Sequence, residues 1–243
     1  MERRKTKRIQ RQKGFQVMRI GGLQKVTLID YPGRVACTVF LSGCNFRCPF
    51  CYSSELVLPE EIKKHPSIKI KDFFRFLSEK KGLLDACVVC GGEPTINGEE
   101  LITFCKRIKE MGFLIKLDTN GSNPDILNKV IPFIDYIAMD IKAPLNDKYK
   151  DFSGIDCLEE IKESIELIKR SGLDYEFRTT ITSHSIDDIL EIANYIAPAK
   201  KYFLQRFVDE KENISGESYF VKEEDLKVIE ENIKNLFEIF KIR

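Results

Sequence analysis

The amino-acid sequence predicts an α/β fold, because short apolar runs alternate with segments that carry apolar residues on one helical face. Several of six such runs are continuously apolar, as expected of strands buried on both faces. The six runs lie at 36–42, 86–92, 113–120, 136–142, 175–181 and 202–208. Alternating strands and helices form a parallel sheet, and six units are too few for a closed eight-unit barrel. An open, partial barrel and a doubly wound sheet therefore both fit the pattern.

Helices are expected between and after these runs, from apolar spacing and capping residues. They lie at 70–80, 99–111, 124–132, 158–170 and 186–196, with a last helix at about 222–240. Ser185 precedes one of them as a capping residue, and Gly112 and Gly172 follow two others, where a C′ glycine is common. In both candidate architectures, functional residues lie at the carboxyl ends of the strands.

Polar residues and glycines gather at the predicted carboxyl ends of nearly all six strands. These ends read Ser42-Gly43, Gly91-Gly92-Glu93-Pro94, Asp118-Thr119-Asn120-Gly121, Asp140-Ile141-Lys142, Arg178-Thr179-Thr180 and Gln205-Arg206. A purely structural barrel does not require this pattern, so we expect a functional site along this edge of the sheet.

Composition favours a soluble, globular protein of one domain, since 43% of the 243 residues are hydrophobic and 32% are charged. No apolar run approaches the roughly 18 residues of a membrane helix. Residues 1–17 form a basic tail without the apolar stretch of a secretory signal. This tail is either solvated or a contact for nucleic acid or an acidic partner. We expect a cytoplasmic protein with no membrane or nucleic-acid partner, whose single domain spans residues 18–243.

Three of the eight cysteines lie in the stretch CNFRCPFC, which spaces Cys44, Cys48 and Cys51 as C-x3-C-x2-C. Three thiolates can hold three irons of a [4Fe-4S] cluster and leave the fourth iron open to a ligand. The alternative is a zinc knuckle completed by a distant Cys or His. A second pair, Cys87 and Cys90, lies in an apolar strand in which a residue and its third neighbour face opposite sides. We therefore expect no metal at that pair.

The cysteine spacing, with Phe50 before the last cysteine, and the GGEP run at 91–94 resemble the radical S-adenosylmethionine (SAM) superfamily. The resemblance implies one [4Fe-4S] cluster on Cys44, Cys48 and Cys51, with SAM on the open iron. Reductive cleavage of SAM then gives methionine and a 5′-deoxyadenosyl radical. The cofactor carries this chemistry, so no side chain is expected to act as a catalytic acid or base.

The same resemblance implies cofactor-binding positions. The backbone around Phe50, Cys51 and Tyr52 is expected at the adenine, and the run Gly91, Gly92 and Glu93 at the methionyl amine. Asp140, Ile141 and Lys142 are similar to cofactor-binding positions of glycyl-radical activating enzymes. Asp118, Thr119 and Asp140 are expected to hold a monovalent cation beside the cofactor carboxylate, and Arg178 to pair with that carboxylate. Ordinary turn chemistry for Asp118 and a surface ion pair for Arg178 are the alternatives. Gln205 stands where some of these enzymes have a histidine on the last strand.

Residues 21–51, which include Tyr31-Pro32-Gly33, resemble activating proteins of anaerobic ribonucleoside-triphosphate reductases. This resemblance implies a partial (β/α)6 barrel of TIM type, with parallel strands and open on one side. It also implies anaerobic installation of a glycyl radical in a partner enzyme, with a low-potential donor such as ferredoxin or flavodoxin. An activase for a pyruvate formate-lyase-like enzyme and a small-molecule enzyme such as a 7-carboxy-7-deazaguanine synthase are the alternatives. A passive iron-sulfur electron carrier is a third alternative, but this function does not account for the GGEP and DIK runs.

Overall fold

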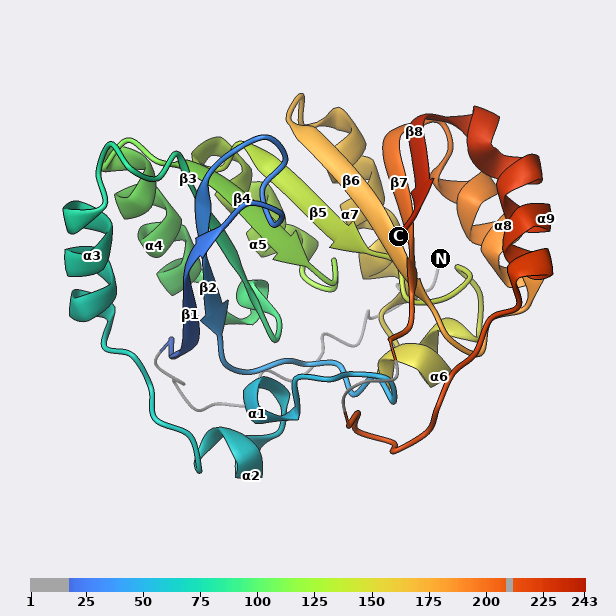
Figure 1. Ribbon diagram of the computed structural model, residues 1–243, viewed down its shortest axis with the longest axis horizontal. Helices are drawn as coiled ribbons and strands as arrows, with labels where there is room; N and C mark the ends of the chain where they lie inside the picture. Colours follow the sequence, from blue (N-terminus) through green and yellow to red (C-terminus); the bar gives the residue numbers. More distant parts are fainter. Residues whose placement is uncertain (1–17, 209–211) are drawn as a thin grey trace, which may run out of the picture.

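In the computed structural model, which describes residues 18–208 and 212–243, eight strands form one sheet and follow chain order (Figure 1). They are β1 (Ile20–Thr27), β2 (Ala36–Leu41), β3 (Ala86–Gly91), β4 (Leu114–Thr119), β5 (Tyr136–Asp140), β6 (Asp174–Ile181), β7 (Ala199–Arg206) and β8 (Phe237–Ile242). β1 runs antiparallel to β2, and the other neighbours are parallel. β1 and β8 form the two edges, so the sheet is the open, partial barrel that the sequence predicts.

The six predicted strands correspond to β2–β7, and both edge strands differ from the prediction. β1 is half-exposed along much of its length, so it lacks the continuous apolar run of an inner strand. The predicted helix to residue 240 is wrong, because α9 (Glu223–Ile233) ends early and β8 follows it. Leu226, Ile229, Ile233, Phe237 and Phe240 keep a helical spacing. Pairing of β8 with β7 overrides that local pattern.

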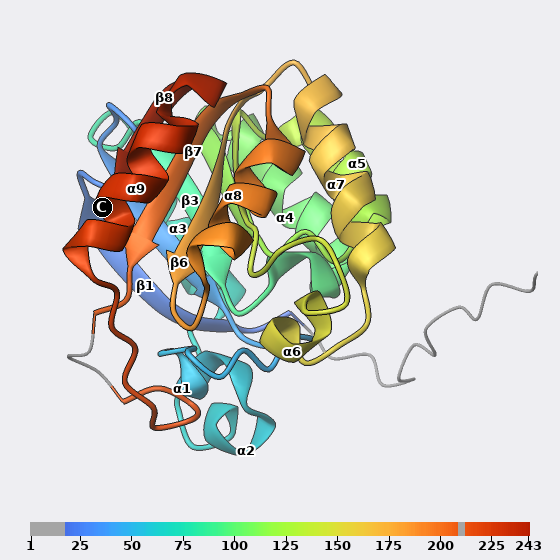
Figure 2. The same ribbon diagram turned by 90° about the vertical axis from the view of Figure 1, so that its right-hand side faces the viewer.

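The longer helices pack on one face of the curved sheet (Figure 2). They are α3 (Ile70–Glu79), α4 (Glu99–Glu110), α5 (Pro124–Val130), α7 (Leu158–Arg170), α8 (Ile186–Ile196) and α9. Between them and the sheet lies the main core, which includes the fully buried Val89, Leu117 and Phe177. Burial of each such side chain contributes about 1.5–3 kcal/mol, so this layer holds the strands in place.

The opposite face of the sheet carries polar side chains, because alternate residues of a strand point to opposite sides. Lys116 of β4 and Glu176 of β6 are buried there. The Tyr136 hydroxyl donates a hydrogen bond to Glu176 Oε2 at 2.7 Å, and its ring lies 5.8 Å from the ring of Tyr31. A buried charged group is costly unless it is paired, so this face is unlike an ordinary core.

The shorter helices lie at the carboxyl end of the sheet, as Figure 1 shows. They are α1 (Ser54–Val57), α2 (Pro59–Ile62) and α6 (Tyr149–Ser153), and the connections also contain the 3-10 turns η1 (Pro94–Asn97), η2 (Ile131–Phe133) and η3 (Lys234–Leu236). None of the helices in the described ranges is long and apolar enough to cross a membrane. The predicted basic tail at 1–17 lies outside the described residues.

Candidate active site

The three clustered cysteines lie on the loop between β2 and α1, at the carboxyl edge of the sheet. We call residues 44–51 the cysteine loop. Cys48 is buried, and Cys44 and Cys51 are half-buried. The Cys51 amide donates to the Cys48 carbonyl at 3.1 Å, and the Phe46 amide donates to Cys44 Sγ at 3.3 Å. The loop therefore turns tightly and brings its thiols to one region.

Three other parts of the chain hold this loop, or Gly43 directly before it, by backbone hydrogen bonds. From the end of β3, the Glu93 amide donates to the Gly43 carbonyl at 2.8 Å. In α6, the Ser153 carbonyl accepts a hydrogen bond from the Arg47 amide of the loop at 2.8 Å. From the connection between β7 and α9, the Ile214 amide donates to the Cys51 carbonyl at 3.1 Å. The position of the cysteines thus depends on segments far apart in the sequence.

The two glycines of the GGEP run allow β3 to end against the cysteine loop. A Cβ on Gly91 would lie 2.3 Å from the Leu41 oxygen, and Gly91 also has a φ of +121°. A Cβ on Gly92 would lie 2.1 Å from the Gly43 oxygen. Only glycine fits such contacts with backbone atoms. The two glycines therefore allow a close backbone contact, and the neighbour that requires it is the chain directly before the cysteine loop.

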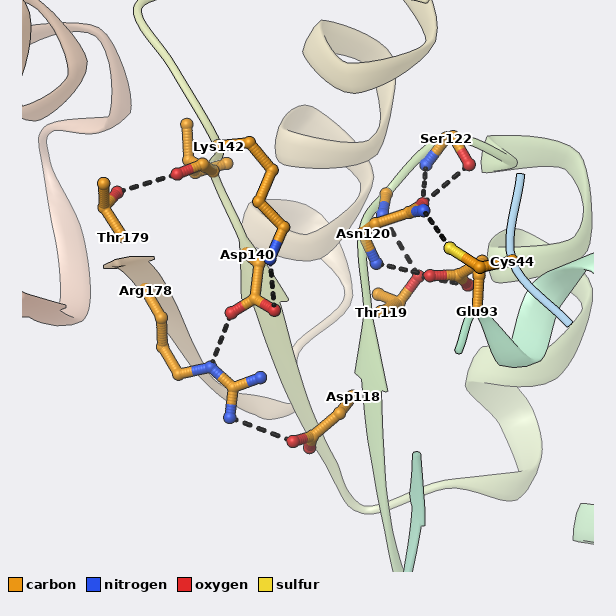
Figure 3. A network of polar contacts seen from close by, with 12 residues as sticks. Cys44, Glu93, Asp118, Thr119, Asn120, Ser122, Asp140, Lys142, Arg178 and Thr179 are labelled. Atoms are coloured by element: carbon orange, nitrogen blue, oxygen red, sulfur yellow. Dashed lines mark hydrogen bonds and ion pairs between the residues drawn. The ribbon is translucent and has the colours of Figure 1, made fainter. Parts of the chain in front are cut away.

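Glu93 is fully buried and ties the ends of β3 and β4 together (Figure 3). Its Oε1 accepts from the Thr95 amide at 2.9 Å and from the Thr119 hydroxyl at 2.8 Å. Its Oε2 accepts from the Asn120 amide at 2.5 Å. Burial raises the pKa of Glu93, and these hydrogen bonds act in the opposite direction. The carboxylate is thus a fixed part of the site wall, and Thr119 serves the same network.

Asp118, Asp140 and Arg178 meet on the polar face, on β4, β5 and β6 (Figure 3). Arg178 donates from Nη1 to Asp118 Oδ2 at 2.9 Å and from Nε to Asp140 Oδ1 at 2.8 Å. Burial alone would raise the pKa of Asp140, but Arg178 and Lys142 outweigh it and hold that pKa well below its usual range. Arg178 stays charged, because the nearby carboxylates raise its pKa despite burial. In place of the surface ion pair considered for Arg178, the structure has a partly buried network of three side chains.

Lys142 connects this network with the cysteine loop. Its Nζ donates to Asp140 Oδ2 at 3.1 Å and lies 5.8 Å from the centre of the Phe50 ring. Ile141, which lies between Asp140 and Lys142 in the sequence, is buried. Its carbonyl accepts a hydrogen bond from the Thr179 hydroxyl at 2.9 Å. The DIK run therefore brings a charged amine close to the predicted adenine-binding segment.

Tyr52 and Gln205 lie on the side of the site formed by β7. The Tyr52 ring stacks on Phe207 at 4.9 Å, and its hydroxyl accepts from the Val208 amide at 2.8 Å and donates to the Val208 carbonyl at 2.5 Å. Gln205 is half-buried and lies level with Thr180 of β6. Tyr52 thus holds the cysteine loop against the chain that leaves β7.

His184, a loop residue that the sequence pattern did not single out, lies beside the DIK run. His184 lies just after the carboxyl end of β6, where it packs on the Phe152 ring at 4.5 Å. Its Nδ1 accepts from the Thr182 amide at 3.2 Å, so the Nε2 that lies 2.9 Å from the Lys142 carbonyl is the donor. Burial lowers the pKa of His184, which favours this neutral form. Its place three residues beyond the predicted strand end at residue 181 was the available signal.

Cys87 and Cys90 face opposite sides of β3, as predicted. Cys87 is fully buried in the core under the helices. Cys90 packs on the polar face with Tyr31 and Tyr136. The two thiols therefore cannot converge on one metal ion.

The cysteine loop fits a [4Fe-4S] cluster. Burial raises the pKa of Cys44 to about 12 and that of Cys48 to about 11, so these thiols need a positively charged partner to ionise. In the described part of the chain, no three His, Cys, Asp or Glu side chains are placed to hold a single ion. A cubane does not require that, because each thiolate binds a different iron.

The expected monovalent cation does not fit this structure. The two aspartates that were to hold it, Asp118 and Asp140, already share the Arg178 guanidinium. Thr119 directs its hydroxyl to Glu93 instead. The space between the two carboxylates is thus filled by a side chain of the protein itself.

An open parallel α/β barrel with a three-cysteine loop at its carboxyl edge defines a metalloenzyme that uses an iron-sulfur cluster and a bound cofactor. Residues 38–196 match the family model of the Radical SAM superfamily, and the chain belongs to that superfamily. It is a radical SAM enzyme, whose cofactors are a [4Fe-4S] cluster and SAM.

Curated relatives include activating enzymes and a synthase. A protein of Methanocaldococcus jannaschii with the provisional name glycyl-radical enzyme activating enzyme is 33% identical over 77% of this chain and 79% of its own length. The 7-carboxy-7-deazaguanine synthase of Thermococcus kodakarensis is 27% identical over 63% of this chain and 66% of its own. The pyruvate formate-lyase-activating enzyme of Clostridium pasteurianum is 29% identical over 56% of this chain and 57% of its own.

Solved structures support the fold. QueE from Escherichia coli superposes with a TM-score of 0.57 at 15% identity, covering 93% of this chain and 94% of its own. At that identity the likeness shows the architecture alone.

Proposed function

We propose that this enzyme installs a glycyl radical in a partner protein, and that the partner is an anaerobic ribonucleoside-triphosphate reductase. The observation that supports an activase most directly is the 33% identity with the M. jannaschii protein over 197 residues. The Tyr31-Pro32-Gly33 element supports the choice of partner. The electron donor in this proposal is a low-potential ferredoxin or flavodoxin.

In this proposal Cys44, Cys48 and Cys51 bind three irons of the cluster. When bound, the cluster and SAM supply an electron and a 5′-deoxyadenosyl radical that abstracts a hydrogen atom from a glycine of the partner. The protein's own residues position these groups. Glu93 fixes the ends of β3 and β4 at 2.5–2.9 Å contacts, and the glycines before it bring the β3 end against the cysteine loop.

The remaining predicted cofactor residues form two walls of the proposed site. Phe50, Cys51 and Tyr52 contact the adenine through their backbone, and Gln205 stands at the end of the neighbouring β7. Asp140 at the end of β5 and Lys142 just after it would contact the cofactor, and the Lys142 amine lies over the Phe50 ring. Arg178, which keeps its positive charge, attracts the methionyl carboxylate. Partial burial of these ion pairs lowers the effective dielectric constant and so strengthens their electrostatic contacts.

Isotope transfer tests the proposal. The enzyme is reconstituted without oxygen, reduced with dithionite, and mixed with SAM and a reductase that carries glycine deuterated at Cα. We expect deuterium in 5′-deoxyadenosine and a glycyl-radical signal in electron paramagnetic resonance (EPR), both absent when Cys51 is replaced with alanine. Cleavage of SAM without deuterium transfer or a protein radical would reject the reductase as partner. A pyruvate formate-lyase labelled in the same way tests the alternative partner.

A small-molecule reaction is the second candidate, because the Thermococcus kodakarensis synthase is also a relative at 27% identity. Such an enzyme acts on a pterin and needs no glycyl-radical protein as a partner. The same reconstituted enzyme, given SAM, dithionite and a pterin but no partner protein, decides between the two functions. A deazaguanine product, formed without any partner protein, would favour the synthase.

A further inference from the structure

Five charged side chains alternate in sign across three neighbouring strands and the turn after β5. We call Lys116, Asp118, Arg178, Asp140 and Lys142, in this spatial order, the ion ladder. Successive members lie 2.9, 2.9, 2.8 and 3.1 Å apart. Their side chains are between 4% and 25% exposed. Buried charges of this kind persist only when each one is compensated.

The centre of the ladder is the Arg178 guanidinium, which bridges the two aspartates (Figure 3). Register places Arg178 directly beside Asp140 on neighbouring strands. Nη1 reaches Asp118 and Nε reaches Asp140, and a more distant pair with Glu176 at 3.8 Å also uses Nη1. The described ion pairs of Arg178 thus leave Nη2 unused. Each of the four carboxylate oxygens of the two aspartates lies within 3.1 Å of a cationic nitrogen, although Asp118 Oδ1 accepts no hydrogen bond within the described part of the chain.

We propose that the Arg178 guanidinium takes the place of a monovalent cation in this site. It neutralises Asp118 and Asp140 through two edges and presents Nη2 to the methionyl carboxylate of SAM. A guanidinium is always charged and has a planar set of donors that can serve several oxygens at once. Because it is tethered to β6, its occupancy does not depend on salt concentration. The protein therefore binds SAM without added sodium, potassium or ammonium ions.

This inference needs the SAM cofactor but not the glycyl-radical partner. Equilibrium dialysis of SAM with the reconstituted enzyme tests it, in potassium chloride and in choline chloride of equal ionic strength. We expect the Kd of the unaltered enzyme for SAM to differ by less than about twofold between the two salts, because equal ionic strength screens charges equally. A loss of SAM binding in choline chloride, restored by potassium, would overturn the proposal.

Removal of the Arg178 guanidinium should create a cation site between Asp118 and Asp140, at the place that the guanidinium now fills. Arg178→Gln leaves two facing carboxylates with space between them, a suitable set of oxygen ligands for a hard cation. We expect the Tm of this variant to be about 5 °C or more higher in potassium chloride than in choline chloride, by mass action on the folded state. Arg170→Gln is the matched control, since it removes an exposed ion pair with Glu166, and its Tm should be the same in both salts.

The outcomes separate the two proposals. An equal response of Arg178→Gln and Arg170→Gln to potassium would contradict the replacement of an ion by Arg178. If Arg178→Gln does not fold, the salt dependence of the unaltered enzyme decides alone. SAM binding without any partner radical would reject the proposed function and leave this inference intact.

Discussion

Replacing Gly92 with alanine tests whether the end of β3 sets the position of the cysteine loop. The new Cβ would lie 2.1 Å from the Gly43 oxygen and 3.2 Å from the Cβ of Cys44. Carbon and oxygen atoms that are not bonded usually stay about 3.3 Å or more apart, so one backbone must move by roughly 1 Å. Overpacking of this kind costs about 1–3 kcal/mol, which lowers the Tm of a domain of this size by about 2–4 °C per kcal/mol.

The displaced atoms adjoin a predicted cluster ligand, so we expect cluster affinity to fall by about tenfold or more, as for other changes around metal ligands. Iron and sulfide per chain after anaerobic reconstitution measure this loss, and thermal unfolding of the apoprotein measures the strain. Gly22→Ala is the control, since its Cβ would meet only the Phe40 side chain at 3.4 Å. Equal iron content and equal Tm in the two variants would refute the reasoning.

Three further changes probe separate parts of the site. Cys51→Ala should abolish the cluster absorbance, whereas Cys105→Ala, in the core under the helices, should retain it; equal loss in both would contradict the ligand assignment. Glu93→Gln should cost about 1–3 kcal/mol in urea unfolding, because an amide group would then oppose buried donors; no change in unfolding free energy would argue against the network. His184 has a folded-state pKa below its ordinary value of 6.5, so the stability from its neutral form is present above pH 6.5 and lost as pH falls below it. His184→Gln should flatten that fall in the unfolding free energy between pH 7.5 and 5.5, and an unchanged slope would exclude His184 as its source.

The inner strands were predictable because burial on both faces leaves a direct mark on the sequence. Runs such as residues 86–92 are apolar whichever way each side chain points. The edge strands carry no such mark. β1 is half-exposed, and β8 has an apolar spacing that also fits a helix. Their assignment depends on pairing with β2 and β7, which local sequence does not encode.

The candidate site was predictable as a set of strand ends but not as a set of contacts. Asp118, Asp140 and Arg178 each follow or end an apolar run, so their common edge could be inferred. Whether these side chains pair depends on the register of their strands, and Asp118 and Arg178 are 60 positions apart in the chain. A slip of one residue would turn either side chain to the other face. The replacement of the expected cation by Arg178 was therefore visible only in three dimensions.

The clamp between Tyr52 and Val208 has a consequence for the order of biosynthesis. These residues are 156 positions apart, which at typical elongation rates is roughly 8–30 s of translation. All three clustered cysteines are synthesised well before Ile214, whose amide donates a hydrogen bond to the Cys51 carbonyl. At that stage a nascent chain has all three predicted iron ligands but lacks the hydrogen bond that Ile214 makes to Cys51. The set of contacts that positions the cysteine loop is thus complete only once residues 208–214 have been synthesised.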